Sequence, residues 1–259
     1  MELTRESMLF LRNLLWSYPG SILSTIIFSS ISVCVSIFAK TGRTQHRLAR
    51  IWGRAVLWFC GIRVDVEGSE NVQPGCSYVF AANHRSYLDS PIILPFIDVQ
   101  FRFFAKSSVF YWPMVGFHLR RSGQLPVHYD NPQKSLKSMS AAARVIQQKG
   151  ISVLLFPEAG RTMGELDPFK DGAAYVAIKA GVPIVPVGLI GSLDILPTGA
   201  GKIRPGKVKI RIGQPIPTLD LTLSDRTRLT QTLWAKVAEL IDYPAPAEKR
   251  GGSLAGVEA

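Results

Sequence analysis

The sequence predicts an α/β fold: a single domain with a mixed, largely parallel sheet flanked by helices, preceded by a helical segment. Three observations lead to this prediction. From Ile62 onward, short apolar runs alternate with longer stretches of helical pattern. The run Ser152–Phe156 is nearly all apolar, as in a strand that is covered on both faces. The stretch before it, Pro132–Lys149, ends at Gly150, a residue that commonly closes a helix.

The first part of the chain carries no charged residue from Leu14 to Ala39. Pro19-Gly20 interrupts this segment and leaves Ser21–Ala39, which is borderline for a membrane span of about 20 residues. Three arrangements stay open: a helix that crosses the bilayer, a hairpin with Met8–Tyr18 that enters one leaflet, or a buried core helix. A signal peptide is not indicated, because the start mixes acidic and basic residues and no small residue lies two positions before Ala39.

The next segment, Thr44–Cys60, has the pattern of a basic amphipathic helix with Trp52 and Trp58 among its apolar residues. Such a helix can lie at a membrane surface or pack on the domain, and both can hold. The positive-inside rule puts this side of the apolar segment in the cytoplasm, at the inner face of the cell membrane. With a net charge of +11 and no recognised nucleic-acid-binding module, we expect an anionic membrane surface as partner and no nucleic acid. The basic residues that begin this region are Lys40, Arg43, Arg47, Arg50 and Arg54.

The remaining elements follow from local pattern, and the chain divides into a membrane-associated segment (1–60), a domain (61–243) and a tail (244–259). The tail is rich in Pro, Gly and charged residues, which predicts disorder. Strands are expected at Arg63–Glu67, Tyr78–Ala81, Phe101–Ala105, Gln124–His128, Ser152–Phe156, Ile184–Leu189 and Lys207–Ile212. Helices are expected at Pro91–Pro95, Trp112–Arg120, Pro132–Lys149, Gly172–Ala180 and Ser224–Ile241.

His84 and Asp89 are the first candidate site residues. Five residues of ideal helix turn by about 500°, which would leave the two side chains about 140° apart. Ser90-Pro91 has the pattern of an N-cap and a first helical proline, so the segment before it is expected to be a turn. A turn can bring the carboxylate to the imidazole and leave the other ring nitrogen as a base. A structural histidine is the alternative, and Ser86 as a nucleophile is disfavoured because no Gly-x-Ser-x-Gly elbow surrounds it.

A second group of polar residues follows the predicted buried strand at Phe156-Pro157-Glu158. Strand ends are where α/β folds place their sites. Arg161 offers paired donors that suit a phosphate, and Lys106 is a further cation at a predicted strand end, although either could be an ordinary surface charge. The three cysteines are widely spaced and form no C-x-x-C pair, so neither a zinc site nor a disulfide framework is predicted.

In these segments the chain resembles the glycerolipid acyltransferase family, and most closely its bacterial 1-acylglycerol-3-phosphate acyltransferases. The resemblance runs from Ile62 to Pro215. Asn83–Asp89 matches the family's N-H-x₄-D motif, and Phe156–Thr162 resembles its F-P-E-G-T-R-S motif. Three more segments occur in the family's order: Phe101–Lys106, Phe169–Gly172 and Val182–Val187.

The resemblance implies that His84 takes a proton from the sn-2 hydroxyl of a lysophosphatidic acid, with Asp89 orienting His84. The freed oxygen would attack the thioester of acyl-CoA or of an acyl carrier protein, giving phosphatidic acid for phospholipid biosynthesis. No metal, no cofactor beyond this co-substrate and no covalent acyl-enzyme are implied. The phosphate would be held by Lys106 and Arg161, the glycerol end or the loop by Glu158, and the acyl side by Val182–Val187. The full set that we assign to substrate binding is Asn83, Arg85, Lys106, Glu158, Gly160 and Arg161.

Two departures from the family pattern leave the acceptor open. Ala159-Gly160 stands where Gly-Thr is usual, and Tyr129 stands where an arginine is usual, a role that Arg120 or Arg121 could take. Alternative acceptors are glycerol-3-phosphate, another lysophospholipid or an acylated amino acid. A membrane lipid-binding protein without catalysis is a further alternative, which the intact pair of His84 and Asp89 disfavours.

Overall fold

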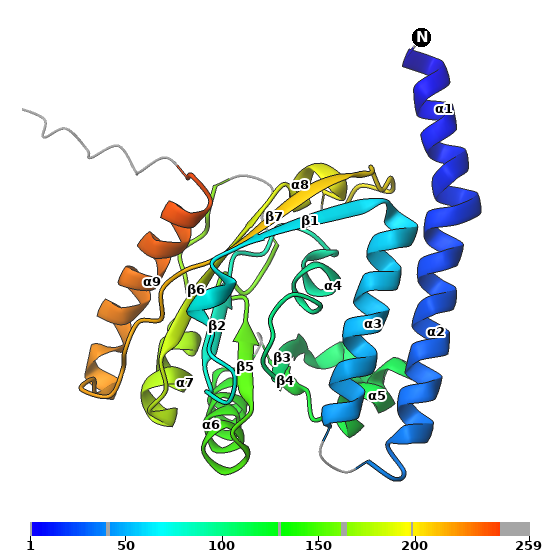
Figure 1. Cartoon of the computed structure of the whole chain (residues 1–259). Coiled ribbons are helices and arrows are strands. Elements are labelled where there is room, and N and C mark those ends of the chain that lie inside the picture. The colour runs from blue at the N-terminus through cyan, green and yellow to red at the C-terminus, as the bar shows by residue number, and fades with distance from the viewer. Residues whose placement is uncertain (1, 40–41, 129–130, 162–164, 198, 244–259) are drawn as a thin grey trace, which may run out of the picture.

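The computed structural model describes residues 2–39, 42–128, 131–161, 165–197 and 199–243. A seven-stranded sheet forms its centre, in the order β1-β7-β6-β2-β5-β3-β4 (Figure 1). Neighbouring strands run parallel except for β6 and β7, which are antiparallel. The sheet is therefore mixed and largely parallel, as predicted. The strands are β1 (Ile62–Glu67), β2 (Val79–Ala82), β3 (Phe101–Lys106), β4 (Leu125–Val127), β5 (Ser152–Leu155), β6 (Ile184–Ile190) and β7 (Gly206–Ile212).

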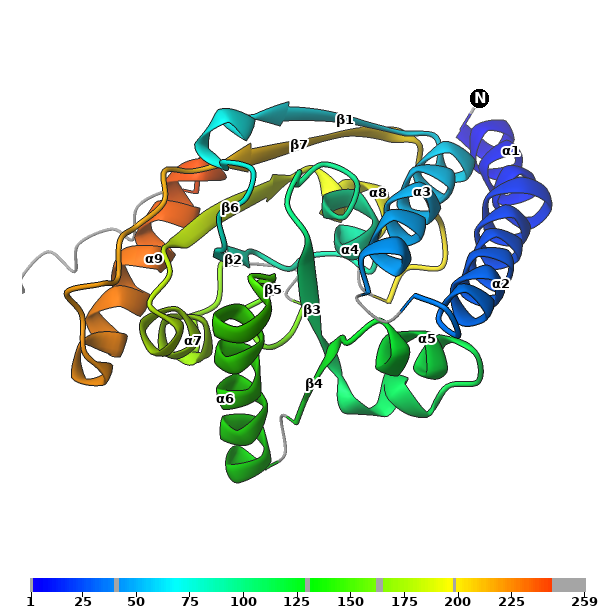
Figure 2. The same ribbon diagram turned by 60° about the horizontal axis from the view of Figure 1, so that its bottom comes forward.

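Helices cover both faces of this sheet (Figures 1 and 2). On one face lie α3 and α4, with α2 and α5 beyond them, and on the other lie α6, α7 and α9. The α-helices of the domain are α3 (Arg43–Cys60), α4 (Asp89–Ile93), α5 (Val115–Arg121), α6 (Pro132–Lys149), α7 (Gly172–Ala180), α8 (Ser192–Ile195) and α9 (Arg226–Leu240). Short 3₁₀ turns are η2 (Ser69–Asn71), η3 (Ser107–Tyr111) and η4 (Leu223–Asp225).

The central strands are buried on both faces, which explains their continuous apolar pattern. Successive residues of β2 and β5 contribute to opposite cores: Phe80 and Leu154 pack on the α3 side, and Val79 and Val153 on the α6 side. All four side chains are fully buried. The amphipathic helix α3 packs Val56, Leu57 and Cys60 into the first core, so it is a helix of the domain as well as a basic one.

The predicted strands all form, and no end is shifted by more than one residue, which is within the usual uncertainty of element boundaries. The predicted start of α4 is wrong. This helix begins at Asp89, so Ser90 is not its N-cap and Pro91 lies inside its first turn. A proline fits there because the first turn has no intrahelical use for its N–H. α5 starts at Val115, later than predicted, because Pro113 ends the 3₁₀ segment η3 in an extended conformation at Trp112.

The N-terminal segment is one continuous helical rod, not a hairpin broken at Pro19. It consists of α1 (Glu2–Arg12), the π-helical turn η1 (Asn13–Ser17) and α2 (Tyr18–Val35). The wider π-helical turn η1 ends two residues before Pro19. Proline has no backbone N–H, so in a regular α-helix the carbonyl group one turn earlier would lose its hydrogen bond. The hairpin that does form pairs α2 with α3 (Figure 1).

The rod is tied to the domain at η1, and one side of α2 contacts α3 and α5, while most of its apolar surface is exposed. The Asn13 side chain donates to Ile203 O at 3.0 Å and accepts from Ile203 N at 3.1 Å, and Ser17 Oγ donates to Phe59 O at 3.1 Å. By length and composition Thr4–Val35 could cross a membrane, and only 17% of its most apolar window is buried. That exposure contradicts a buried core helix and is consistent with membrane association. The predicted tail, 244–259, lies outside the described residues.

Candidate active site

One large cavity at the carboxyl ends of the parallel strands is lined by four of the predicted site residues, His84, Lys106, Gly160 and Arg161. Its volume is about 1120 Å³, slightly above the roughly 300–1,000 Å³ of sites for one small ligand. His84 enters it from the loop after β2, Lys106 from the end of β3, and Phe156 and Arg161 from the loop after β5. Segments that are far apart in sequence therefore meet here, as the motif spacing predicts.

His84 and Asp89 form the predicted pair. His84 Nδ1 lies 2.8 Å from Asp89 Oδ2, and the Asp89 side chain is fully buried. The same oxygen accepts the backbone N–H groups of Arg85 at 2.7 Å and Ser86 at 2.8 Å. Because two backbone N–H groups donate to this oxygen, it is an acceptor, and Nδ1 of His84 donates its hydrogen to it. Nε2 is then the ring nitrogen available to a substrate.

Two further contacts fix the imidazole and the loop that carries it. The His84 ring stacks on Phe156, with centroids 4.0 Å apart and planes at 14°. The His84 backbone N–H donates to Glu158 Oε1 at 2.6 Å, and Glu158 Oε2 accepts from Asp167 N at 3.3 Å. Glu158 is buried and does not line the cavity, so it joins two loops rather than contacting the glycerol end of a substrate.

Asn83 and Arg85 also belong to the framework of the site. Asn83 is buried and pairs with the backbone of Leu189 on β6, accepting at 2.7 Å and donating at 2.9 Å. Arg85 is buried beside the pair, and its backbone supports Asp89. Neither residue lines the cavity, so the geometry favours a supporting role for both over direct contact with a substrate. Ser86 is fully buried, and its hydroxyl donates to Leu196 O at 2.8 Å, which leaves it unsuited to act as a nucleophile.

The loop after β5 has an unusual backbone at the position where the sequence departs from the family. Ala159 has φ 61°, the left-handed region in which glycine is the usual residue. Gly160, by contrast, has space around its Cα for a side chain. The glycine has thus moved one place away from the position that needs it, and Ala159 carries the strain. Arg161 follows, with its guanidinium 4.2 Å from the centroid of the Tyr87 ring.

The wall of the cavity differs in chemistry from one part to another, and we call these parts the apolar arm and the basic arm. The side chains that α2, α3 and α5 contribute are mainly apolar, whereas the end of β3, the loops after β4 and β5 and the start of α9 contribute basic side chains. Residues of the apolar arm include Phe28, Trp52, Leu94, Phe103, Val109 and Leu119. Residues of the basic arm include Lys106, His128, Arg161, Lys170 and Arg226. No roles were predicted for His128, Lys170 and Arg226, because only the fold brings them to this cavity.

Two histidines in the apolar arm are held neutral. Burial, with Arg102 and Arg50 nearby, lowers the pKa of His46 to about 3. Burial also lowers the pKa of His118, whose Nδ1 lies 2.6 Å from Ser32 Oγ. The arm therefore carries no charge from these side chains at neutral pH, which suits a hydrocarbon chain.

Other predicted features lie elsewhere or outside the described residues. Val182–Val187 does not line the cavity, and its residues Ile184–Val187 run through the core on β6, between β2 and β7. Its role on the acyl side stays a prediction that this cavity does not support. Tyr129 and Thr162 are outside the described residues. Arg120 and Arg121 bind backbone oxygens of Phe110 and Ser36, and neither lines the cavity.

Residues that could hold a metal do not come together in the described part of the chain, where no group of three or more His, Cys, Asp or Glu side chains is close enough. The three cysteines are free, with Cys60 buried and Cys34 and Cys76 exposed.

Comparison with known proteins identifies relatives over most of the chain. Residues 63–190 match the family model described as Acyltransferase. The chloroplastic 1-acyl-sn-glycerol-3-phosphate acyltransferase BAT2 of Brassica napus is 33% identical over 177 residues, which cover 66% of this chain and 50% of that protein. The human 1-acyl-sn-glycerol-3-phosphate acyltransferase beta is 27% identical over 234 residues, covering 88% of this chain and 83% of that protein.

A solved structure has the same fold. The 1-acyl-sn-glycerophosphate acyltransferase PlsC of Thermotoga maritima superposes with a TM-score of 0.75 at 22% identity, covering 93% of this chain and 98% of that one. Against the plant relatives the overlap is shorter: the chain matches 50% of the Brassica protein and 64% of a Limnanthes alba 1-acyl-sn-glycerol-3-phosphate acyltransferase.

Proposed function

Residues 63–190 of this chain belong to the acyltransferase family, and from that premise we propose that the protein acylates the sn-2 hydroxyl of 1-acyl-sn-glycerol-3-phosphate. The acyl group comes from a thioester, and the product is phosphatidic acid. The observation that carries the proposal is the pair of His84 and Asp89, 2.8 Å apart, with His84 at a cavity that has both apolar and basic walls. Relatives named for this reaction support it.

The pair supplies a general base. Asp89 holds the proton of Nδ1, so Nε2 of His84 accepts the proton of the acceptor hydroxyl. The hydroxyl oxygen forms a C–O bond to the thioester carbonyl, and the C–S bond then breaks. The proton on Nε2 passes to the departing thiolate, which leaves as a thiol. Asp89 stabilises the imidazolium between these steps. No serine nucleophile takes part, consistent with the buried hydroxyl of Ser86.

The two arms divide the substrates. Lys106 and Arg161 in the basic arm bind the acceptor phosphate, since a phosphate monoester carries nearly two negative charges and guanidinium gives paired donors. The uncharged arm takes a hydrocarbon chain. Acyl-CoA or an acyl carrier protein is the acyl donor, and the protein needs no metal or other cofactor. Glycerol-3-phosphate or another lysophospholipid is the alternative acceptor, because these cations recognise the phosphate rather than the alcohol behind it.

The membrane context is part of the proposal. We infer that the protein binds an anionic membrane on its cytoplasmic face; the length and composition of the rod α1–α2 and the basic residues of α3 support this. There the cavity receives a lipid acceptor from the bilayer and a water-soluble donor from the cytoplasm.

A panel assay tests the reaction. Purified protein is incubated with radiolabelled acyl-CoA and vesicles that contain lysophosphatidic acid, other lysophospholipids or glycerol-3-phosphate. We expect labelled phosphatidic acid and loss of activity in His84→Ala by a factor of about 10³ or more. Ser86→Ala is the matched control for a serine hydrolase and should keep acyl transfer. Full activity of His84→Ala, or product from none of the acceptors, would contradict the proposal.

Acceptor binding has its own test. Arg161→Ala should raise the KM for lysophosphatidic acid about tenfold or more, because it removes a charge-assisted phosphate contact, and should change the KM for acyl-CoA much less. An equal rise in both KM values would argue that Arg161 does not contact the acceptor phosphate.

A further inference from the structure

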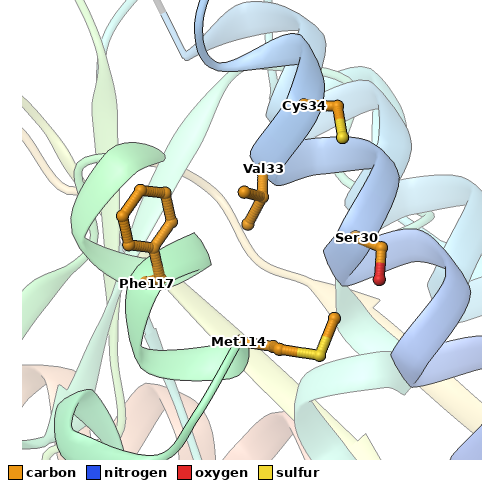
Figure 3. A pocket seen from close by; sticks show the side chains of 5 residues that line it. All are labelled: Ser30, Val33, Cys34, Met114 and Phe117. Carbon is orange, nitrogen blue, oxygen red and sulfur yellow. The ribbon is translucent and has the colours of Figure 1, made fainter.

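An apolar hollow of about 380 Å³ lies where α2 meets α5, separate from the large cavity (Figure 3). Val33 on α2 lies opposite Met114 and Phe117 at the start of α5. Ser30 also lines it, but its hydroxyl donates to Ile26 O at 2.7 Å and is already satisfied. The fifth lining residue, Cys34, is exposed. The wall is therefore apolar, and its volume lies within the range of sites that bind one small ligand.

The same two helices separate this hollow from the active-site cavity. Their inner side lines the cavity with Phe28 and Ser29 of α2 and with Val115, His118 and Leu119 of α5. Their outer side lines the hollow. The partition between the two spaces is thus a single pair of helices.

Side-chain hydrogen bonds hold this partition closed. Ser32 Oγ lies 2.6 Å from His118 Nδ1, and Arg121 donates to Ser36 Oγ at 3.1 Å and to Ser36 O at 2.5 Å. α5 has only seven residues and follows Met114, whose φ of 58° is unusual for a residue other than glycine. A short helix that starts at a strained residue and is latched by a few polar contacts can shift without loss of the domain core.

The hollow belongs to a wider apolar surface formed by α2 and the start of α5. Phe38, shortly after α2, is 86% exposed. Further exposed apolar residues of this surface are Ile26, Ile27, Ile31, Met114 and Phe117. Exposed apolar area of this extent marks a site of contact with a membrane or a partner. The neighbouring helix α3 carries the exposed Arg47, which suits anionic headgroups.

We propose that the α2–α5 hollow binds the acyl chain of the lysolipid acceptor, and that the parting of Ser32 from His118 admits this chain from the bilayer to the cavity. The inference rests on the proposed function. It assigns the hollow to the acceptor because the donor arrives from water on a large polar carrier, whereas a lysolipid already lies in the bilayer with one chain. The hollow gives that chain an apolar path beside the membrane-facing helix, and the phosphate can then reach the basic arm.

Direct binding can be measured without turnover. Cys76→Ser leaves Cys34 as the exposed thiol for a bimane probe, since Cys60 is buried and its pKa is raised by burial. In the His84→Ala background the acceptor is not consumed. We expect lysophosphatidic acid with a nitroxide on its chain, in phosphatidylcholine vesicles, to quench the probe at least about twofold more than the same mole fraction of nitroxide phosphatidylcholine. Equal quenching by both lipids would show bilayer contact only and would overturn the proposal.

Filling the hollow tests its use in turnover. Val33→Trp places a large side chain in the hollow, and Ile22→Trp is the matched control on an exposed position of the same helix outside it. Val33→Trp should raise the KM for long-chain lysophosphatidic acid about tenfold, and leave a short-chain, water-soluble acceptor and the KM for acyl-CoA within about twofold. The control should change neither. If both acceptors are affected alike by Val33→Trp, the hollow is not the path of the chain.

A reversible lock tests the opening itself. Ser32→Cys with His118→Cys, in a background of Cys34→Ser and Cys76→Ser, is compared with itself before and after oxidation. The oxidised form should lose activity on the long-chain acceptor, keep it on the short-chain one, and recover with reductant. If the oxidised form turns over the long-chain acceptor as fast as the reduced form, the proposed separation of α2 and α5 is wrong. Inactivity of the reduced form on every acceptor, together with inactive wild type, would instead reject the proposed function.

Discussion

The Asp89 carboxylate organises the candidate site at the scale of single residues. One of its oxygens, Oδ2, accepts from the His84 ring and from two backbone N–H groups, so the turn and the base are built on the same atom. The spacing of His84 and Asp89 predicted this contact, and only the helix start was misplaced. The reason is that α4 begins at Asp89, whereas the pattern Ser90-Pro91 indicated a helix that begins at Pro91.

Asp89→Asn should therefore separate charge from geometry. The amide oxygen can replace Oδ2, and the amide nitrogen would take the place of Oδ1, which has no hydrogen-bond partner in the described structure. We expect kcat to fall by a factor of about 10²–10⁴ because the imidazolium loses its counter-charge, with KM values nearly unchanged. Steady-state kinetics would show this. A higher KM with an unchanged kcat would mean that Asp89 acts in substrate binding.

Ala159 allows a prediction about strain. Its left-handed backbone costs an L-residue roughly 1–2 kcal/mol, whereas glycine pays less in the folded state and more entropy in the unfolded one. Ala159→Gly is therefore expected to raise the free energy of unfolding by up to about 1 kcal/mol. Urea denaturation measures it, with Gly160→Ala as the control in open space. A marked loss of stability in Ala159→Gly would show that the loop is not strained at this residue.

At the scale of elements, the sequence predicted which segments are helices and strands, but it did not predict how the N-terminal helices continue or where they attach to the domain. The helix α6 and the strand β5 were placed from an apolar pattern and a closing glycine, which are local signals. The continuous rod α1–α2 was not predicted, because Pro19 was expected to interrupt the helix. The π-helical turn η1 before Pro19 lets the helix continue through it. Its fixation by Asn13 to Ile203 is a long-range contact that no local pattern contains.

The contact between α3 and β3 makes stability depend on pH through His46. Its ring packs on Phe101 with centroids 4.9 Å apart, and burial beside Arg102 and Arg50 lowers its pKa to about 3. The unfolded chain, with a pKa of about 6.5, binds the proton more readily, so stability is full above about pH 6.5 and is lost as pH falls toward 3.

The expected slope is up to about 1.4 kcal/mol per pH unit from this one group. Urea unfolding of wild type between pH 7 and pH 5 measures it. His46→Gln should flatten the dependence by about one proton, although its stability at pH 7 falls through lost packing. A variant whose stability changes with pH as steeply as the wild type would exclude His46 as the source.

At the scale of the whole molecule, the sheet order decides what the site contains. Because β5 lies between β2 and β3, the loops of Lys106, His84 and Arg161 meet at one edge. The sequence motifs predicted this meeting through resemblance. They could not show that Glu158 and Asn83 brace the site, or that Arg226 on α9 reaches the cavity, since these depend on packing between distant segments.

The distribution of charge over the molecule predicts how it meets a membrane. Exposed Arg47 lies on α3 beside the apolar rod, whereas exposed Arg144 lies on α6 across the sheet. A basic residue near an anionic surface contributes about 1 kcal/mol, so Arg47→Glu should weaken binding to phosphatidylglycerol vesicles by about tenfold or more at low salt. Arg144→Glu changes net charge equally and should have a clearly smaller effect, because it lies beyond the reach of the surface potential. Vesicle sedimentation at several salt concentrations measures both. Equal losses would mean that overall charge, and not the face formed by α2 and α3, governs binding, and the orientation that brings the α2–α5 hollow to the bilayer would then have no support.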